Sequence, residues 1–145
     1  MPRDDETKHP PYLETIKKRG REANPFFMLM GVEVMHIGNG EATLEMPVRP
    51  DMHNGEGWLQ GGLFVSLADE AMALALYTIL DDTERIATVS EATNFMKGVQ
   101  DGKVVATGRV VKKGRRVAFA EGEVREGTPD GELLTKTTAA FAVMR

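Results

Sequence analysis

One acidic side chain in the sequence stands where a charge is difficult to bury. Asp69 lies within the segment 61–80, whose apolar residues recur at helical spacing. An unpaired carboxylate on an apolar helix loses its hydration, and this loss opposes folding unless the charge has a partner or a use. The pattern therefore favours a function for Asp69. The neighbouring Glu70 is expected to be an ordinary solvated position.

The start of the same segment carries a pair of glycines. Gly61 and Gly62 follow Trp58, Leu59 and Gln60, and none of these three is a Ser, Thr or Asp that would cap the first turn. The first amide groups of the helix are therefore left free at the positive end of the helix dipole, where an oxyanion binds well. Alternatively, the two glycines only allow the helix to pack closely against a sheet. The sequence leaves both interpretations open.

The spacing of these two features predicts an oligomer. Asp69 lies eight residues after Gly61, which is about 12 Å along an α-helix that rises about 1.5 Å per residue. The carboxylate of one chain therefore cannot serve the helix start of the same chain. A two-fold partner with an antiparallel helix would bring its Asp69 to this Gly61. We expect a homodimer or a dimer of dimers with sites composed of two chains.

The elements that position these residues follow from periodicity and turn signals. Residues 1–23 are polar and charged, and they form an N-terminal extension with an expected short helix over 12–19. Residues 24–145 form the main domain, which opens with the cap Asn24 and the first-turn residue Pro25 of a second short helix. The expected strands, separated by turn sequences, are 32–37, 42–46, 87–96, 103–112, 115–124 and 133–144.

This order of elements predicts an α+β fold. Two strands come first, one long helix follows, and four strands joined by tight turns complete the chain. A helix that is apolar on nearly all sides must be covered by other elements. An antiparallel sheet curled around a single central helix satisfies the order, and this arrangement is the hotdog architecture.

Composition and charge exclude several classes of protein. The 145 residues fit one domain, and the lack of cysteine excludes disulfides, zinc–thiolate sites and cysteine nucleophiles. The formal net charge of −4 gives no support to nucleic-acid binding, and the three histidines lack the spacing of metal ligands. The charged N-terminus does not resemble a secretory signal, and polar residues interrupt the segment 61–80, which makes it a poor membrane span. We expect a cytoplasmic protein without a metal or a membrane segment.

The residues around the helix start resemble a known motif. The pattern Asn54-x-x-Gly57-x-x-Gln60-Gly61-Gly62, followed by Leu67-Ala68-Asp69, resembles that of the phenylacetic-acid-degradation-type hotdog thioesterases. Their pattern is N-x-x-G-x-x-H-G-G, then L-x-D or L-x-E in the helix. The likeness continues through 87–96 and the final strands, so it covers roughly residues 25–144. It implies hydrolysis of an acyl-CoA to a free acid and CoA, without a cofactor.

The resemblance also implies a role for each matching residue. Asp69 matches the catalytic carboxylate, a nucleophile or a general base for water, and the Gly61 amide matches the donor that polarises the thioester carbonyl. Asn54 matches the polar residue that helps to hold the thioester or the water. Thr88 matches the hydroxyl that assists the carboxylate. In the family, Gly61 and Asn54 come from one subunit and Asp69 and Thr88 from the other, which agrees with the spacing argument.

One position departs from the family motif. Gln60 stands where the family usually has histidine, and glutamine keeps a donor and an acceptor but cannot change its protonation state. The leading interpretation is a working thioesterase. The alternative is a non-catalytic protein that binds an acyl-CoA or another ligand, in which Gln60 marks lost catalysis. A hydratase of the same fold is disfavoured because its Asp and His pattern is missing.

The sequence holds one concentrated group of basic residues, at an expected turn between strands. It comprises Lys112, Lys113, Arg115 and Arg116. CoA carries a 3′-phosphate and a diphosphate, and cationic side chains bind such groups. In relatives this hairpin often lies near the nucleotide, so the resemblance implies a CoA contact. The alternative is a solvated hairpin tip that protects a sheet edge.

Overall fold

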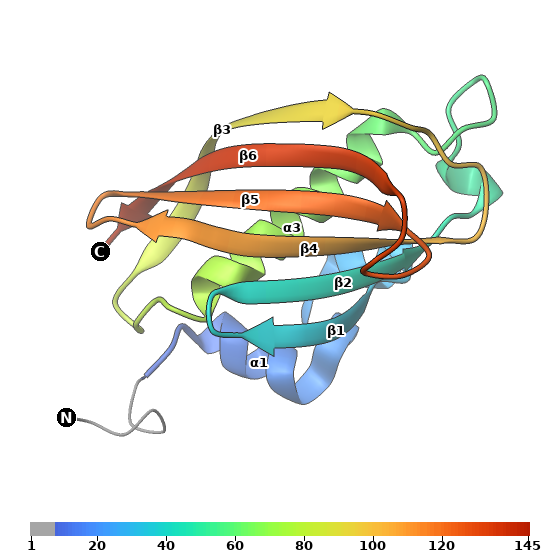
Figure 1. Cartoon of the computed structure of the whole chain (residues 1–145). Coiled ribbons are helices and arrows are strands. Elements are labelled where there is room, and N and C mark those ends of the chain that lie inside the picture. Colours follow the sequence, from blue (N-terminus) through green and yellow to red (C-terminus); the bar gives the residue numbers. More distant parts are fainter. Residues whose placement is uncertain (1–7) are drawn as a thin grey trace.

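The computed structural model describes residues 8–145 and consists of an antiparallel sheet with one long helix on one face (Figure 1). The sheet has six strands in the order β1-β2-β4-β5-β6-β3. The predicted α+β hotdog fold is confirmed. The elements are α1 (Pro11–Arg19), α2 (Pro25–Met30), β1 (Glu33–Gly38), β2 (Glu41–Pro47), α3 (Gly61–Tyr77), β3 (Arg85–Phe95), β4 (Lys103–Lys113), β5 (Val117–Glu126) and β6 (Leu133–Met144).

The two short helices form where local signals place them. The Asn24 side chain caps α2 by accepting hydrogen bonds from the amides of Phe26 at 2.9 Å and Phe27 at 3.3 Å. Gly31 ends α2 in the left-handed region, with φ of 69°, where glycine has no steric penalty. Leu13 and Ile16 of α1 are buried in the same core as α3. Residues 1–7 of the predicted N-terminal extension lie outside the described residues.

The long helix α3 ends at Tyr77, three residues earlier than expected from the apolar pattern. The Thr78 hydroxyl donates to the Ala75 carbonyl at 2.6 Å and accepts from the Gly40 amide at 2.8 Å. This second bond ties the end of α3 to the turn between β1 and β2. A contact between residues far apart in the sequence therefore fixes where the helix stops.

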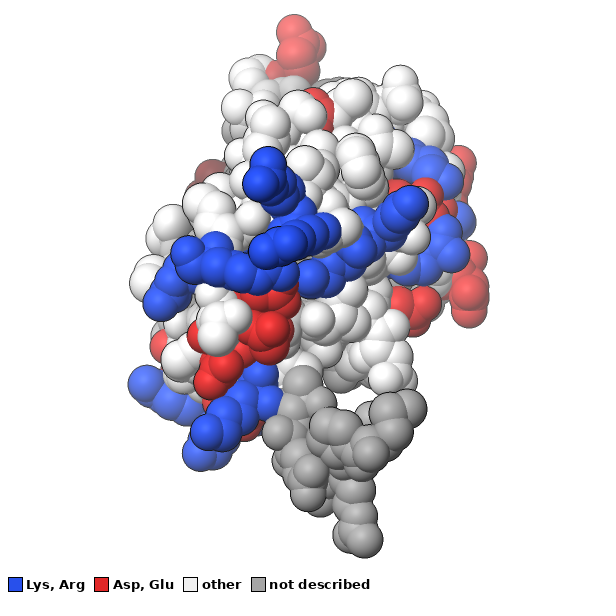
Figure 2. Space-filling view, turned by 90° about the vertical axis from the view of Figure 1, so that its left-hand side faces the viewer, with Lys and Arg blue, Asp and Glu red and all other residues white. Residues whose placement is uncertain are grey.

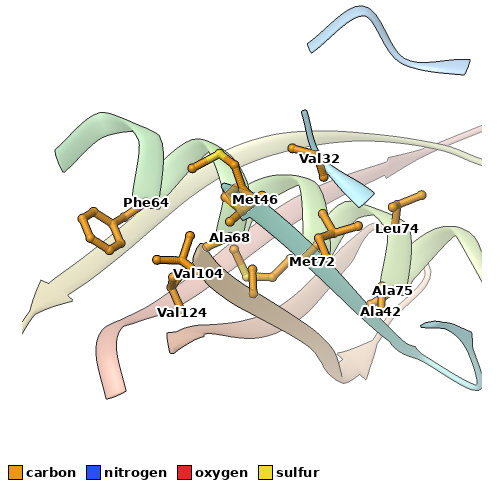
Figure 3. Close-up of a cluster of buried hydrophobic side chains, with 14 of the residues drawn as sticks. Val32, Ala42, Met46, Phe64, Ala68, Met72, Leu74, Ala75, Val104 and Val124 are labelled. Atoms are coloured by element: carbon orange, nitrogen blue, oxygen red, sulfur yellow. The ribbon is translucent and has the colours of Figure 1, made fainter. Parts of the chain in front are cut away.

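The helix lies directly on the backbone of the sheet at two facing glycines. Gly108 of β4 and Gly122 of β5 are paired in register. A Cβ atom at Gly108 would lie 2.4 Å from the Ala71 carbonyl oxygen, so only glycine allows this approach. Figure 3 shows the resulting core, in which Met72 of α3 lies among side chains from the sheet. The close packing holds α3 at a fixed height above the strands.

One strip of α3 stays uncovered by its own chain. The buried positions of the helix are Phe64, Leu67, Ala68, Ala71, Met72, Leu74, Ala75 and Leu76, whereas Asp69, Glu70 and Ala73 are only partly covered. Other elements cover most of the helix, as expected, because the sheet and α1 pack against it, and this strip is the part that a single chain leaves partly exposed. The uncovered strip carries the candidate carboxylate.

Strand β3 forms an edge of the sheet and, among residues 8–145, pairs only with β6. It exposes Val89 at 66% and Phe95 at 56% of their surface. An unpaired edge with exposed apolar side chains is a surface that other chains can cover. No helix within residues 8–145 has the length and apolar character needed to cross a membrane.

Candidate functional site

The structure brings Asp69 and Thr88 into direct contact. The Thr88 hydroxyl of β3 donates a hydrogen bond to Asp69 Oδ1 of α3, with 2.9 Å between the two oxygens. Strand β3 runs antiparallel to α3. Its last residue, Phe95, packs edge-on against Phe64 near the start of the helix, whereas Thr88 contacts the middle of the helix. The carboxylate therefore lies between the middle of the helix and the first half of the edge strand. Its second oxygen remains available to a substrate or a water.

A bulge in β3 controls which side chains reach Asp69. Thr88 pairs with Phe141 and Ser90 with the next residue, Ala140, so Val89 is the extra residue. Side chains three apart in a regular strand point to opposite faces. The bulge shifts this alternation, so that Thr88 and Glu91 both face the helix. Their partners Phe141 and Ala139 belong to the buried core beneath α3.

Glu91 is therefore a second carboxyl group at the site, and sequence reasoning missed it. Its Oε2 atom is buried and has no hydrogen-bond partner within the part of the chain that the structure describes. Burial, and to a smaller extent the adjacent Asp69 carboxylate, raises the pKa of Glu91 to about 7. Strict alternation along β3 would have placed this residue on the outer face. No residue pattern within the strand indicated the bulge.

The start of α3 offers amide donors, as the sequence predicted. No side chain caps it, and Gln60 uses its backbone, donating to the Met52 carbonyl at 3.0 Å and accepting from Leu63 at 3.0 Å. Within residues 8–145, the amides of Gly61 and Gly62 donate to no acceptor. A Cβ atom at Gly61 would lie 3.6 Å from the Phe95 ring, an ordinary contact, so close packing does not demand glycine here.

Asn54 shapes the loop that leads to the helix. Its side-chain Oδ1 accepts from the backbone amides of Glu56 at 2.9 Å and Trp58 at 3.1 Å. Its backbone amide donates to the Trp58 carbonyl at 2.7 Å. His53 holds the same loop through a bond of 2.7 Å between its Nε2 and the Gln100 carbonyl. The Asn54 oxygen is therefore occupied, and its exposed NH₂ group is the part left for a ligand.

In one chain the candidate residues form two separate groups. Asp69 and Thr88 contact each other, and Asn54, Gln60 and Gly61 belong to one continuous loop and helix start. Two turns of α3, about 12 Å, separate the groups. The two groups are therefore apart within a single chain, and the expected composite site still requires a second copy of the chain.

A pocket of about 320 Å³ opens beside Asp69 and Thr88. Its walls come from α1, α3, β3 and β6, and the rings of Tyr12 and Tyr77 meet edge to face with centroids 5.2 Å apart. Burial raises the pKa of Tyr12 to about 12, so its hydroxyl stays neutral. The apolar lining residues are Ala73, Ile86, Ala87 and Phe141.

Glu70 lies at the polar end of this pocket. The expectation that it is an ordinary solvated residue is therefore wrong. The Asn24 side-chain amide donates to Glu70 Oε2 at 3.3 Å and to the Tyr12 hydroxyl at 2.8 Å. Burial, with a smaller contribution from the Asp69 charge, raises the pKa of Glu70 to about 6. The cap residue Asn24 contacts this side chain, which the helical pattern alone did not show.

The basic residues gather around the turn between β4 and β5. Figure 2 shows a band of Lys and Arg side chains on this end of the molecule. Lys113 is already paired there, because its Nζ lies 2.8 Å from Oε2 of the buried Glu84. Arg145 binds the same oxygen at 2.9 Å. Lys112, Arg115 and Arg116 remain exposed.

Sequence comparison places this fold and motif in a family. A family model described as the thioesterase superfamily matches residues 56–132, more than half of the chain. The chain therefore belongs to the thioesterase superfamily, whose members hydrolyse thioesters. The resemblance to hotdog thioesterases that the motif indicated is confirmed.

Individual relatives agree with this assignment. A Saccharolobus solfataricus protein named as an esterase is 26% identical over 133 residues, covering 92% of this chain and 93% of the relative. The 1,4-dihydroxy-2-naphthoyl-CoA hydrolase of Listeria monocytogenes is 23% identical, covering 80% of this chain and 94% of the relative. A mutant structure of the phenylacetic acid degradation protein PaaI from Thermus thermophilus is 29% identical with a TM-score of 0.74, covering 82% of this chain and 98% of that one.

Proposed function

We propose that the protein hydrolyses an acyl-CoA thioester to a free carboxylic acid and CoA. The observation that supports this most directly is the half-buried Asp69 carboxylate, which is held by the Thr88 hydroxyl at 2.9 Å and borders a pocket of about 320 Å³. One named relative favours a CoA ester over other thioesters, because it is a 1,4-dihydroxy-2-naphthoyl-CoA hydrolase.

The proposed chemistry uses groups of the protein alone, without a metal or redox cofactor. Asp69 attacks the thioester carbonyl carbon, or it takes a proton from a water that attacks. In either case the carbonyl oxygen gains negative charge, and the free Gly61 amide at the positive end of α3 stabilises it. The C–S bond then breaks, and the sulfur leaves as a thiolate that takes up a proton. Where Asp69 itself attacked, a water then hydrolyses the acyl–Asp69 anhydride, which releases the free acid and restores the carboxylate. The Asn54 NH₂ group and the Gln60 side chain help to hold the thioester or the water.

A homodimer, alone or paired into a tetramer, supplies the complete site in this proposal. Asp69 and Thr88 of one chain would face Asn54, Gln60 and Gly61 of the other. The unpaired edge of β3 and the uncovered strip of α3 support such an interface, because both present surface next to the carboxylate. In sedimentation at micromolar concentration we expect a dimer or tetramer and no detectable monomer. A monomer with full activity would contradict the composite site.

The exposed part of the basic group is proposed to hold the phosphates of CoA. Replacing Lys112, Arg115 and Arg116 by alanine should raise KM about tenfold, since each exposed ion pair contributes up to ~1 kcal/mol. The rate constant kcat should change little, and added salt should weaken wild-type binding. Lys113→Ala is the matched control, because Lys113 is paired with Glu84 and its loss should lower stability more than affinity. An unchanged KM in the triple variant would make the turn an ordinary solvated tip.

The decisive experiment is a turnover assay on purified protein with a panel of aryl, short-chain and medium-chain acyl-CoA esters. Released CoA is measured with a thiol reagent. Hydrolysis of any ester supports the proposal, and the best substrate of the panel shows which kind of acyl group the pocket accepts. Binding of an acyl-CoA without release of thiol would instead support the alternative, a non-catalytic acyl-CoA-binding protein in which Gln60 marks lost catalysis.

A further inference from the structure

Glu91 is a half-buried acidic group beside the candidate site, and the proposed reaction has no role for it. It faces α3 only because the bulge at Val89 turns it toward Asp69. Its Oε2 atom is buried without a hydrogen-bond partner in the described chain. An ionised carboxylate in such a place is strongly disfavoured, so the oxygen needs either a donor or a proton of its own.

The surroundings of Glu91 offer a second acid rather than a base. Asp69 of α3 is the charged group that acts on it. The helix-facing neighbours on β3 and β6 are Thr88, Thr93 and Ala139, none of which ionises. Two adjacent carboxyl groups hold a proton between them, because ionising both places like charges in contact. The lack of a donor to Glu91 and the presence of Asp69 beside it therefore both indicate that Glu91 and Asp69 together carry one proton.

We infer that Glu91 is a positioning residue of the site, which holds one proton in common with Asp69 and donates it in a hydrogen bond to the Asp69 carboxylate. This inference rests on the proposed hydrolysis, in which Asp69 reacts. The Thr88 hydroxyl already donates to Asp69 Oδ1, and the Glu91 proton makes a second hydrogen bond to the same carboxylate, whose remaining lone pairs stay free for the substrate or the water. The two donors together fix the orientation of the carboxylate, with its charge on Asp69 and the proton on Glu91.

A dependence on pH follows from this arrangement. Below the Glu91 pKa of about 7, the pair carries one negative charge and the hydrogen bond is intact. As pH rises through that value, Glu91 loses its proton, and its charge repels Asp69 from the position set by Thr88. Turnover should therefore fall on the alkaline side near neutral pH. The same sign holds for stability, because a carboxyl with a raised pKa stabilises the fold while protonated.

The first test compares the pH profiles of kcat for the wild-type protein and three variants. Glu91→Gln keeps a neutral donor that cannot ionise, so it should stay within about threefold of wild type near pH 6 and lose the alkaline fall. Glu91→Ala removes the donor and should lose about tenfold or more below the Glu91 pKa of about 7, where the wild-type residue is protonated. Glu126→Gln, an exposed glutamate on β5, should keep the wild-type profile. An alkaline fall that survives in Glu91→Gln overturns the inference.

The second test needs no substrate and separates this inference from the proposed function. Carboxyl-carbon NMR should show Glu91 titrating near pH 7 in the wild-type protein. In Asp69→Asn the neighbouring charge is gone, and the midpoint should drop by about one unit or more. A wild-type midpoint at the ordinary value for glutamate, or no change in Asp69→Asn, overturns the inference whether or not acyl-CoA is hydrolysed. The same titration decides the matter if Glu91→Gln fails to fold.

Discussion

Asp69→Asn is expected to lower kcat by at least about 10²–10⁴-fold, the range for loss of a general base. Asparagine has the same size, and its amide oxygen can still accept the Thr88 hydroxyl, which lies 2.9 Å from Asp69 Oδ1. The fold and CoA binding should therefore persist, while a base and a nucleophile are lost. The measurement is kcat with the best ester of the panel, together with the melting temperature and the affinity for CoA.

Gln60→His provides the internal comparison for that result. It restores the residue that the family motif usually carries at this position, so activity should hold or rise if Gln60 is a tolerated replacement in a working enzyme. Full activity in Asp69→Asn would remove this residue from the mechanism. The basis for the site would then be lost, since Thr88 and Glu91 were placed in it through their contacts with Asp69.

Gly61→Pro should lower kcat by about 10²–10³-fold, the loss typical for one oxyanion donor. Proline deletes the amide hydrogen, and it is well tolerated at the first position of a helix. The preceding Gln60 has ψ of 128°, which suits a residue before proline. Space is available, because a Cβ atom at Gly61 meets only the Phe95 ring at 3.6 Å. The measurement is kcat at saturating ester, with the melting temperature as the check on folding.

Gly61→Ala is the matched control, since it adds the same Cβ atom and keeps the amide hydrogen. Near-wild-type turnover in this variant would attribute the loss in Gly61→Pro to the donor. Mixing Asp69→Asn with Gly61→Pro subunits then tests the composite site. A mixed dimer has one site built from the intact halves of both chains, so activity should return toward half of wild type per dimer. If Gly61→Pro is fully active, the helix start plays no part in catalysis.

Local patterns in the sequence were sufficient for the framework of the protein. The cap Asn24 and the glycine at position 31 define α2, because the backbone bonds at a helix end are satisfied by neighbouring residues. The alternation of apolar residues and the turn signals gave the strands to within a few residues. Asp69 was identifiable because a carboxylate on an apolar helix conflicts with burial, whatever the rest of the fold.

The surroundings of that carboxylate depend on partners distant in the chain. Glu91 joins Asp69 through a bulge in β3, Glu70 is contacted by Asn24, and Lys113 is paired with the buried Glu84. A bulge is a property of two paired strands, and an ion pair or hydrogen bond depends on which side chains the fold brings together. Periodicity describes one segment at a time, so it gave the carboxylate but not the second acid that shares its proton. Tertiary packing set that pairing, and with it the expected pH dependence of the site.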